Sequence, residues 1–447
     1  MRAGSRILAF VVPALAVSVA APSARGQVNL KTAAALDTTR TAAPESTLTT
    51  APPASPPTAA SVPAARVRLD LSPVSDQPVT EHSFIPARTE DREPPSWIEP
   101  EHFRGWGRYN RVEGPAVFVE LERPLSRASF LPRVVGGMGY AFAPERGQYR
   151  LEMEQPVLPR HKVTVGAAAF RAFRPFFYQD EALSSEENTA SAFFLHRDYW
   201  DWYESEGLRG TVGLHPSPFM TVTVGVVRAD EASLQNHADW SVFRQTKNFE
   251  ANAPIVDGQY RGYEAAAAYD TRPRNGDRRG RSAWGAMENY LRVSWERAGA
   301  GLGGDADQWR VSADLRNYFR ISPRQSLATR ILAGTGHDRM GVLAPQRRFA
   351  VGGLGTLRGH LYRDLRGDHL ALVNLEYSFD LGRRSRALLF VDAGTAWDAG
   401  SLADQRIPID VGTGFRFGQD GLTLLLAQTV NESHADPKVY IRLGESF

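Results

Sequence analysis

The residues of this sequence best suited to specific chemistry are one arginine in a glycine-rich stretch and two acids that follow it. Arg358 lies in the stretch G-G-L-G-T-L-R-G, residues 352–359, where four glycines allow the backbone to turn sharply and to lie close to other structure. Its guanidinium is a planar set of donors that suits carboxylates. Glu376 and Asp392 lie on the next two strand-like segments. We therefore expect the stretch to fold back into a β-barrel, where Arg358 pairs with these two acids.

Two other interpretations of the stretch are open. Glycine-rich loops can bind phosphate, but no Gly-Lys-Ser/Thr follows and no segment of helical period begins after it. Alternatively, Arg358 is one of several ordinary arginines inside a barrel, like Arg310, Arg316 and Arg416. The candidate site residues are Gly352, Gly353, Leu357, Arg358 and Gly359 in the loop, with Glu376, Asp392 and Gly394 as its partners in the lumen.

Motifs of enzymes and metal sites are absent from the sequence. There are no cysteines, so disulfides and thiolate metal sites are excluded. The ten histidines are scattered, and neither the Gly-x-Ser-x-Gly of serine hydrolases nor the His-Glu-x-x-His of zinc proteases occurs. We therefore predict no catalytic residue, no metal and no cofactor, and we predict that the protein is not an enzyme.

The overall composition limits the class of protein. Lys and Arg number 52 against 50 Asp and Glu, and this near balance argues against nucleic acid as a partner. A mean hydropathy of −0.34 and 23% charged residues exclude a membrane protein built of many helices. A transmembrane β-barrel, which is polar inside and apolar outside, has this kind of average.

The first hundred residues differ in composition and patterning from the rest of the chain. Residues 1–26 have a positive start, a short apolar core and small residues before Gln27, as in a cleaved signal peptide. The alternative, an uncleaved membrane anchor, would need a longer apolar run. Residues 27–65 are rich in Thr, Ala and Pro and are predicted to be a disordered linker. Residues 66–104 are predicted to be a short periplasmic segment, either a strand or a plug-like piece.

From residue 105 to residue 447 apolar and polar residues alternate, which predicts β-strands with one apolar face. In one segment, Trp309, Val311 and Ala313 alternate with Arg310 and Ser312. A soluble β-sandwich would also alternate. Charges confined to one parity and aromatic residues near strand ends favour a membrane barrel instead. The sixteen predicted strands are residues 115–123, 133–142, 147–156, 162–172, 191–202, 207–214, 219–228, 259–270, 285–296, 308–320, 325–335, 369–380, 386–394, 408–418, 421–430 and 437–447.

We therefore predict an all-β fold, a 16-stranded antiparallel transmembrane β-barrel, in which the first strand meets the last. The residues predicted to mark this closure and the terminal signal are Pro115, Val439, Ile441, Leu443 and Phe447. Pro115 lacks a backbone donor, so the seam between these strands is expected to be weakly paired. One segment conflicts with the arrangement, because Phe173–Ala190 is long on the side where turns should be short. Either the fifth strand is wrong or this segment holds a helix.

Several motifs in order resemble the BamA/TamA superfamily of outer-membrane assembly and secretion barrels, also called the surface-antigen family. They are G-G-L-G-T-L-R-G-H, N-L-E-Y-S-F, L-F-V-D-A-G-T-A-W-D, V-G-T-G-F-R-F and a terminal Phe. The resemblance covers about the last 340 residues. It implies that Arg358 is the loop arginine lodged within the barrel and that Glu376 and Asp392 are its interior partners. Barrels of this superfamily usually carry periplasmic POTRA modules, and none is expected between Gln27 and Arg104.

The resemblance implies a role in inserting or translocating outer-membrane polypeptides, or lipid, through the seam. A passive pore or structural barrel is the alternative, and an outer-membrane hydrolase is a third. The expected location is the cell outer membrane, with the N-terminal segment in the periplasm. Expected partners are the membrane lipids, including lipopolysaccharide, with unfolded outer-membrane or secreted polypeptides and a periplasmic protein as further candidates.

Overall fold

The computed structural model divides the chain after Asp70 into two units, and every residue that it describes belongs to the second unit, Leu71–Phe447. The predicted signal peptide and linker, and all but the last two residues of the 66–104 segment, therefore lie outside the described residues. The described residues are 103–123, 131–158, 162–176, 183–243, 248–272, 287–339, 341–382, 385–417, 422–432 and 436–443.

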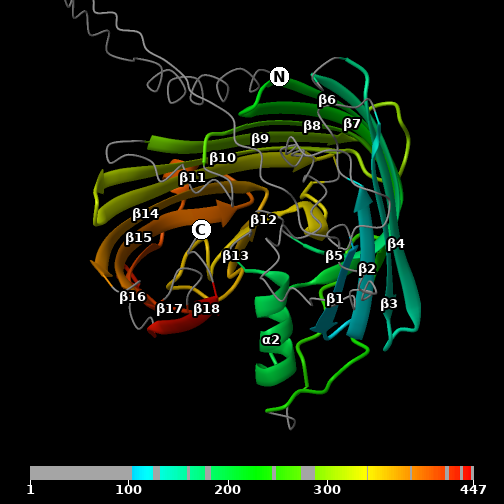
Figure 1. The fold of residues 1–447 in the computed structure, drawn as a ribbon. Coiled ribbons are helices and arrows are strands. Elements are labelled where there is room, and N and C mark those ends of the chain that lie inside the picture. The colour runs from blue at the N-terminus through cyan, green and yellow to red at the C-terminus, as the bar shows by residue number, and fades with distance from the viewer. Residues whose placement is uncertain are drawn as a thin grey trace, which may run out of the picture. The chain divides into compact units, whose positions relative to one another are not determined.

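One antiparallel sheet of 16 strands dominates this unit, and each of its strands pairs with the next one along the chain (Figure 1). A second, two-stranded sheet is formed by β12 (Phe349–Val351) and β13 (Leu365–Gly367). The strands of the large sheet are β1 Phe103–Asn110, β2 Gly114–Arg123, β3 Arg133–Ala141, β4 Arg146–Pro156, β5 Val163–Pro175, β6 Trp202–Ser217, β7 Met220–Ser233, β8 Gly258–Asp270, β9 Met287–Ala298, β10 Gln308–Ser322, β11 Gln325–Asp338, β14 His369–Gly382, β15 Ser385–Trp397, β16 Ile409–Phe417, β17 Leu422–Thr429 and β18 Lys438–Leu443.

The alternation in the sequence explains the two faces of this sheet. Successive side chains of a strand point to opposite faces. In β17, Leu422, Leu424 and Leu426 are exposed on the outer face, whereas Thr423 and Leu425 are buried on the inner face. Most buried charged side chains of the strands lie on the inner face, for example Arg416 and Asp392. The all-β, 16-stranded antiparallel prediction is thus confirmed.

The predicted fifth strand, residues 191–202, is wrong. Residues Ser185–Leu195 form a helix, α2. The Ser184 hydroxyl accepts a hydrogen bond from the Glu187 backbone, and the Glu187 carboxylate accepts one from the Ser184 backbone. This reciprocal capping box satisfies backbone donors that a helix start would otherwise leave unpaired, so it favours a helix here. No helix in the described part of the chain is both long and apolar enough to cross a membrane.

The predicted strand 115–123 is present as β2, but it is not the first strand of the sheet, because β1 precedes it. Two glycines in F-R-G-W-G-R-Y-N interrupt the alternation of large apolar residues, which hid this strand in the sequence. Pro115 consequently lies in β2, opposite Tyr109 of β1, and is not at an edge of the sheet. One strand gained and one lost leave the total at 16. With this register, the long connection 176–201 falls at the same end as 234–257 and 339–368, and the conflict in the sequence disappears.

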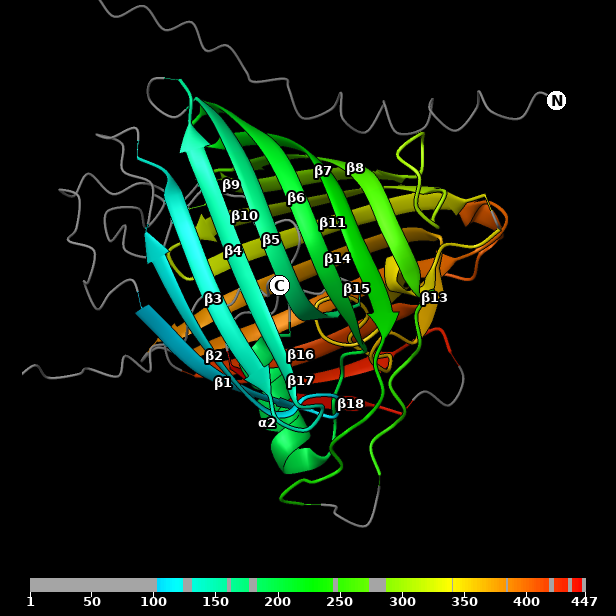
Figure 2. The same ribbon diagram turned by 90° about the vertical axis from the view of Figure 1, so that its right-hand side faces the viewer.

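The two edge strands of the sheet are β1 and β18. Among the described residues, no backbone pairing joins them. Figures 1 and 2 both show α2 at the break between these strands, with its axis pointing away from the sheet. The sheet thus curves round with one break, and a helix lies in that break.

Candidate functional site

The glycine-rich stretch follows β12 and connects it to β13. Gly352 has a φ of 129° and Gly353 a φ of 84°, which are values that side chains with a Cβ rarely adopt. The Gly352 N–H donates to the Thr356 hydroxyl at 2.9 Å, and a Cβ on Gly352 would clash with the Leu361 carbonyl oxygen. The tight turn therefore requires glycine at both positions.

Leu357 anchors this loop against the sheet. Its side chain is fully buried in an apolar cluster with Phe349 and Val351 of β12. Leu370 and Leu372, on the inner face of β14, belong to the same cluster. Burial of this kind stabilises the loop by about 2 kcal/mol per large apolar side chain. Apolar packing alone therefore fixes the loop against the inner face of β14, apart from any contribution of ion pairs.

Arg358 is 1% exposed and is enclosed by two carboxylates of adjacent strands. Its Nε donates to Asp392 Oδ2 at 2.7 Å and its Nη2 donates to Asp392 Oδ1 at 2.7 Å. Its Nη1 donates to Glu376 Oε2 at 2.8 Å. The guanidinium also stacks over the Phe390 ring, with its central carbon 3.5 Å from the ring centroid. The structure thus brings together the three charged residues that the sequence singled out.

The electrostatics of this cluster favour a charged arginine. Burial by itself would lower the pKa of Arg358, but Asp392 and then Glu376 outweigh it, and the pKa lies above its ordinary value.

Two neighbours on β14 and β15 complete the surroundings of the ion pair. Asn374, which is opposite Asp392 in the β14–β15 register, donates to Asp392 Oδ1 at 2.8 Å and to the Thr356 carbonyl at 2.7 Å. Gly394 lies further along β15, opposite Leu372, where a Cβ would crowd the backbone of β14.

Asp410 of β16 is a site residue that the sequence analysis did not connect to the loop. It accepts from the Gly359 N–H at 2.6 Å and from the Thr429 hydroxyl at 2.7 Å. A Cβ on Gly359 would lie 2.5 Å from Asp410 Oδ1, so glycine allows this close approach. His360 Nδ1 lies 3.2 Å from Asp410, and this hydrogen bond raises the pKa of His360.

The connection between β11 and β14, which contains this loop, also reaches the early strands. Arg347 donates to Glu231 of β7 at 2.6 Å and to the Tyr203 hydroxyl of β6 at 3.2 Å. Arg363 donates to the Phe176 carbonyl at 3.0 Å. Both arginines are nearly fully buried. Residues 345–363 therefore link the early strands to the late strands across the inside of the sheet.

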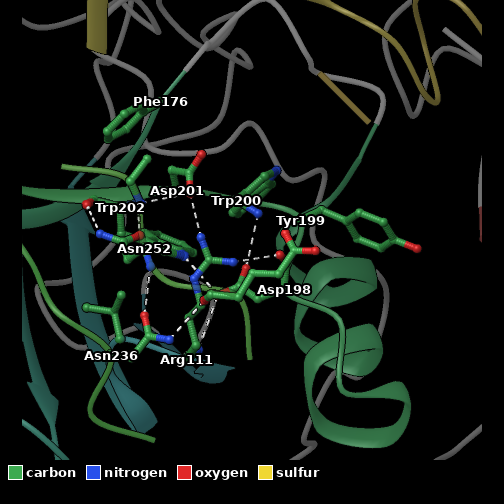
Figure 3. Close-up of polar contacts among 12 residues, drawn as sticks. Arg111, Phe176, Asp198, Tyr199, Trp200, Asp201, Trp202, Asn236 and Asn252 are labelled. Atoms are coloured by element: carbon green, nitrogen blue, oxygen red, sulfur yellow. Dashed lines mark hydrogen bonds and ion pairs between the residues drawn. The ribbon is translucent and has the colours of Figure 1, made fainter. Parts of the chain in front are cut away.

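A second polar cluster lies where the β1–β2 turn meets the segment before β6 (Figure 3). The Arg111 guanidinium donates to the Asp198 carbonyl at 3.0 Å and binds the Asp201 carboxylate. The Asp198 carboxylate accepts from the Arg111 N–H at 3.1 Å and from the Trp202 indole at 3.2 Å. Burial raises the pKa of Asp198, and Arg111 opposes that shift. This cluster fixes the turn of the first hairpin to the loop that carries α2.

The residues predicted for closure are only partly at the break. Val439 and Ile441 point outward from β18 and are exposed. Leu443 ends β18 opposite Leu422, whereas Phe447 lies outside the described residues. Pro115 is one strand away from the edge, as described above. The break is therefore bounded by β1 and β18. Within the described ranges, no group of three or more His, Asp or Glu side chains is arranged to hold a metal ion.

Two protein-family models match parts of the chain. Residues 268–419 match the Omp85 superfamily domain, and residues 102–275 match the C-terminal domain of DUF5686, a family of unknown function. Comparison with curated protein sequences gives no match.

Solved structures that are similar include BamA from Haemophilus ducreyi lacking POTRA domains 1–3, with 14% identity and a TM-score of 0.49, covering 76% of this chain and 68% of that one. CdiB from Acinetobacter baumannii has 14% identity and a TM-score of 0.40, and CdiB from Escherichia coli has 12% and 0.41. Each CdiB comparison covers 76% of this chain, and the chain spans 58% and 61% of the respective CdiB chains.

The sheet, its apolar outer face and the matched domain define the class, which is that of outer-membrane β-barrels. Within that class, residues 268–419 form an Omp85 superfamily domain, and the resemblance to the BamA/TamA superfamily is confirmed. The whole loop cluster, from Gly352 to Asp410, lies inside the matched range.

Proposed function

We propose that the chain takes part in the insertion or translocation of polypeptides, or of lipid, at the outer membrane, through the break between β1 and β18. The observation that carries this proposal is the open pair of edges, since no backbone pairing joins these strands among the described residues. An unpaired edge presents a row of backbone donors and acceptors, to which a client strand can add. The Omp85 superfamily domain supports the same role.

The loop inside the sheet supports β18, which is one of the two strands at the break. Tyr440 of β18 donates from its hydroxyl to the His360 carbonyl at 3.1 Å, so the loop supports the last strand from inside. Because Arg358 ties the loop to β14 and β15, β18 is indirectly held by the strands that precede it. The role proposed for Arg358 is thus to position the loop and the border strand. It requires no catalytic residue, cofactor or metal ion.

The N-terminal residues extend this proposal. In it, residues 1–26 direct export, residues 27–65 form a linker, and the part of residues 66–104 that precedes β1 lies in the periplasm. A linker of that length and composition can reach a periplasmic partner without fixing its position. Cross-linking from this segment in cells would identify the partner.

Photo-cross-linking tests the proposed use of the break. A photoreactive residue would replace Phe103 on β1 or Val439 on β18, both exposed on the outer face. Val373, exposed on β14 in the middle of the sheet, is the matched control. With the protein in vesicles and an unfolded eight-stranded barrel polypeptide as the probe, we expect adducts at the two edge positions and few at Val373. Equal yields at all three positions would contradict the proposal.

Conductance distinguishes the proposal from a passive pore. The loop and its buried arginines occupy the inside of the sheet, so the intact protein should show little steady conductance in a planar bilayer. A large and constant open conductance in the intact protein would favour the passive pore instead.

A further inference from the structure

The helix α2 is polar at one end and apolar at the other. Its first half, Ser185–Thr189, reads S-E-E-N-T, and its last four residues, Ala192–Leu195, read A-F-F-L. A helix on the surface of a protein usually separates polar from apolar residues around its axis. Separation along the axis instead suits a helix whose two ends lie in different surroundings.

The polar end lies against the inner face of the sheet. The Glu187 carboxylate is 3.6 Å from Arg442 Nε of β18, and both side chains are largely buried. Asn188 is buried too and donates to the Asp198 carboxylate at 2.8 Å. The first half of α2 is therefore held among the charged groups of the lumen.

The middle of α2 contacts the other edge of the sheet. The Tyr109 N–H of β1 donates to the Thr189 hydroxyl at 3.3 Å. The residue opposite Tyr109 is Pro115 of β2. The Pro115 carbonyl accepts from the N–H of Phe142, which directly follows β3, so Pro115 is hydrogen-bonded on the β3 side and the Tyr109 N–H points away from β2. Thr189 thus takes a donor that a neighbouring strand would otherwise use. One helix therefore contacts both edge strands, as its position in Figures 1 and 2 indicates.

The apolar end projects beyond the break and is exposed. Phe194 is 47% exposed and Leu195 50%, and in the adjoining segment Trp240 is 49% and Phe243 58% exposed. We call these four residues the aromatic end. The two segments are joined, because the Phe243 N–H donates to the Phe194 carbonyl at 3.2 Å. Large apolar side chains gathered in this way on a protein surface mark an interaction site for a membrane or for another molecule.

We propose that α2 passes through the break between β1 and β18, and that its aromatic end contacts the lipid bilayer. The surface beside it supports lipid as the partner, since Val439 and Ile441, on the edge strand whose Arg442 contacts α2, are exposed apolar residues of the membrane-facing wall. The aromatic end extends that wall across the break. Phe and Trp are also the residue types of membrane-interface belts. The proposal does not depend on any insertion activity.

Fluorescence quenching at single cysteines tests this placement. The chain has no cysteine, so each variant carries one label. A small fluorophore would be attached to Phe194→Cys or Phe243→Cys, with the protein in vesicles of phosphatidylcholine and phosphatidylglycerol. Val373→Cys on the outer face of β14 is the lipid control, and Arg406→Cys, in an exposed loop, is the water control.

We expect brominated acyl chains to quench the labels at 194 and 243 about as strongly as the label at 373, and aqueous iodide to quench only the label at 406. Because Phe243 lies outside α2, it keeps the test valid if the helix variant fails to fold. Iodide quenching at both aromatic positions, with lipid quenching kept at 373, would overturn the proposal alone. Loss of lipid quenching at 373 as well would overturn the membrane placement of the sheet and this proposal together.

Discussion

Replacing Arg358 with alanine should lower the free energy of unfolding by several kcal/mol, about the cost of breaking a buried ion pair. The substitution removes the cation and leaves two carboxylates in a buried site, where Asp392 is fully buried and Glu376 is 7% exposed. Three hydrogen bonds of 2.7–2.8 Å are lost together with the contact to the Phe390 ring.

The magnitude follows from the charge that is left uncompensated. Removing one partner of a buried ion pair costs about 3–5 kcal/mol. Asn374 still donates to Asp392 in the variant, and protonation of one carboxylate limits the penalty, so we expect the lower half of that range. Arg358→Lys keeps the charge but loses the paired geometry, and its cost should be smaller, about 1–2 kcal/mol.

The assay is urea unfolding of the protein in vesicles, followed by the fluorescence of its nine tryptophans. A double-mutant cycle with Asp392→Asn isolates the pair, because removing the acid first should reduce the cost of removing the arginine. Arg406→Ala is the matched control. Its side chain is 65% exposed and lies 3.9 Å from Glu432, so the loss should be near zero, at most about 1 kcal/mol.

Two results would refute the reasoning. One is an Arg358→Ala variant as stable as the Arg406→Ala control. The other is a double-mutant cycle in which the two costs simply add, since that would mean that Arg358 and Asp392 do not interact.

Three further predictions concern the same loops. His360 has a raised pKa, so its contribution to loop docking is complete at low pH and declines as pH rises above about 6.5; His360→Gln should abolish this pH dependence of unfolding. Gly359→Ala should cost about 1–3 kcal/mol, because its Cβ would meet Asp410, and an unchanged urea midpoint would show that the loop is not held there. Arg111→Ala should expose the segment around Asp198 to protease while leaving the urea midpoint of the sheet nearly unchanged, because that cluster lies in the loops; equal resistance of the two proteins would speak against it.

The strands could be predicted where each follows an unbroken alternation. Residues 308–320 were predicted as a strand and the structure has Gln308–Ser322, because every second side chain there faces lipid or lumen. The same parity placed Glu376 and Asp392 on the inner face. Because a buried guanidinium needs carboxylate partners, these two inward-facing acids were enough to predict the contacts of Arg358.

The errors came from segments whose local signals compete. A-F-F-L in α2 suggests a strand by composition, and only the spacing of Ser184 and Glu187 indicates a helix start. In β1 the glycines remove the apolar side of the alternation. The contact of Asp410 with Gly359 joins residues 51 positions apart, and no local pattern contains that information.

The connection between β11 and β14 has a consequence for the order in which the protein assembles. Its contacts reach back 187 positions, from Arg363 to Phe176, and forward 51 positions, from Gly359 to Asp410. Bringing together groups so distant along a chain is slow, and neither set of contacts exists until its strands are paired. We therefore expect this connection to dock inside the sheet only after the early and the late strands have paired. Its protection from protease would then report that folding of the sheet is complete.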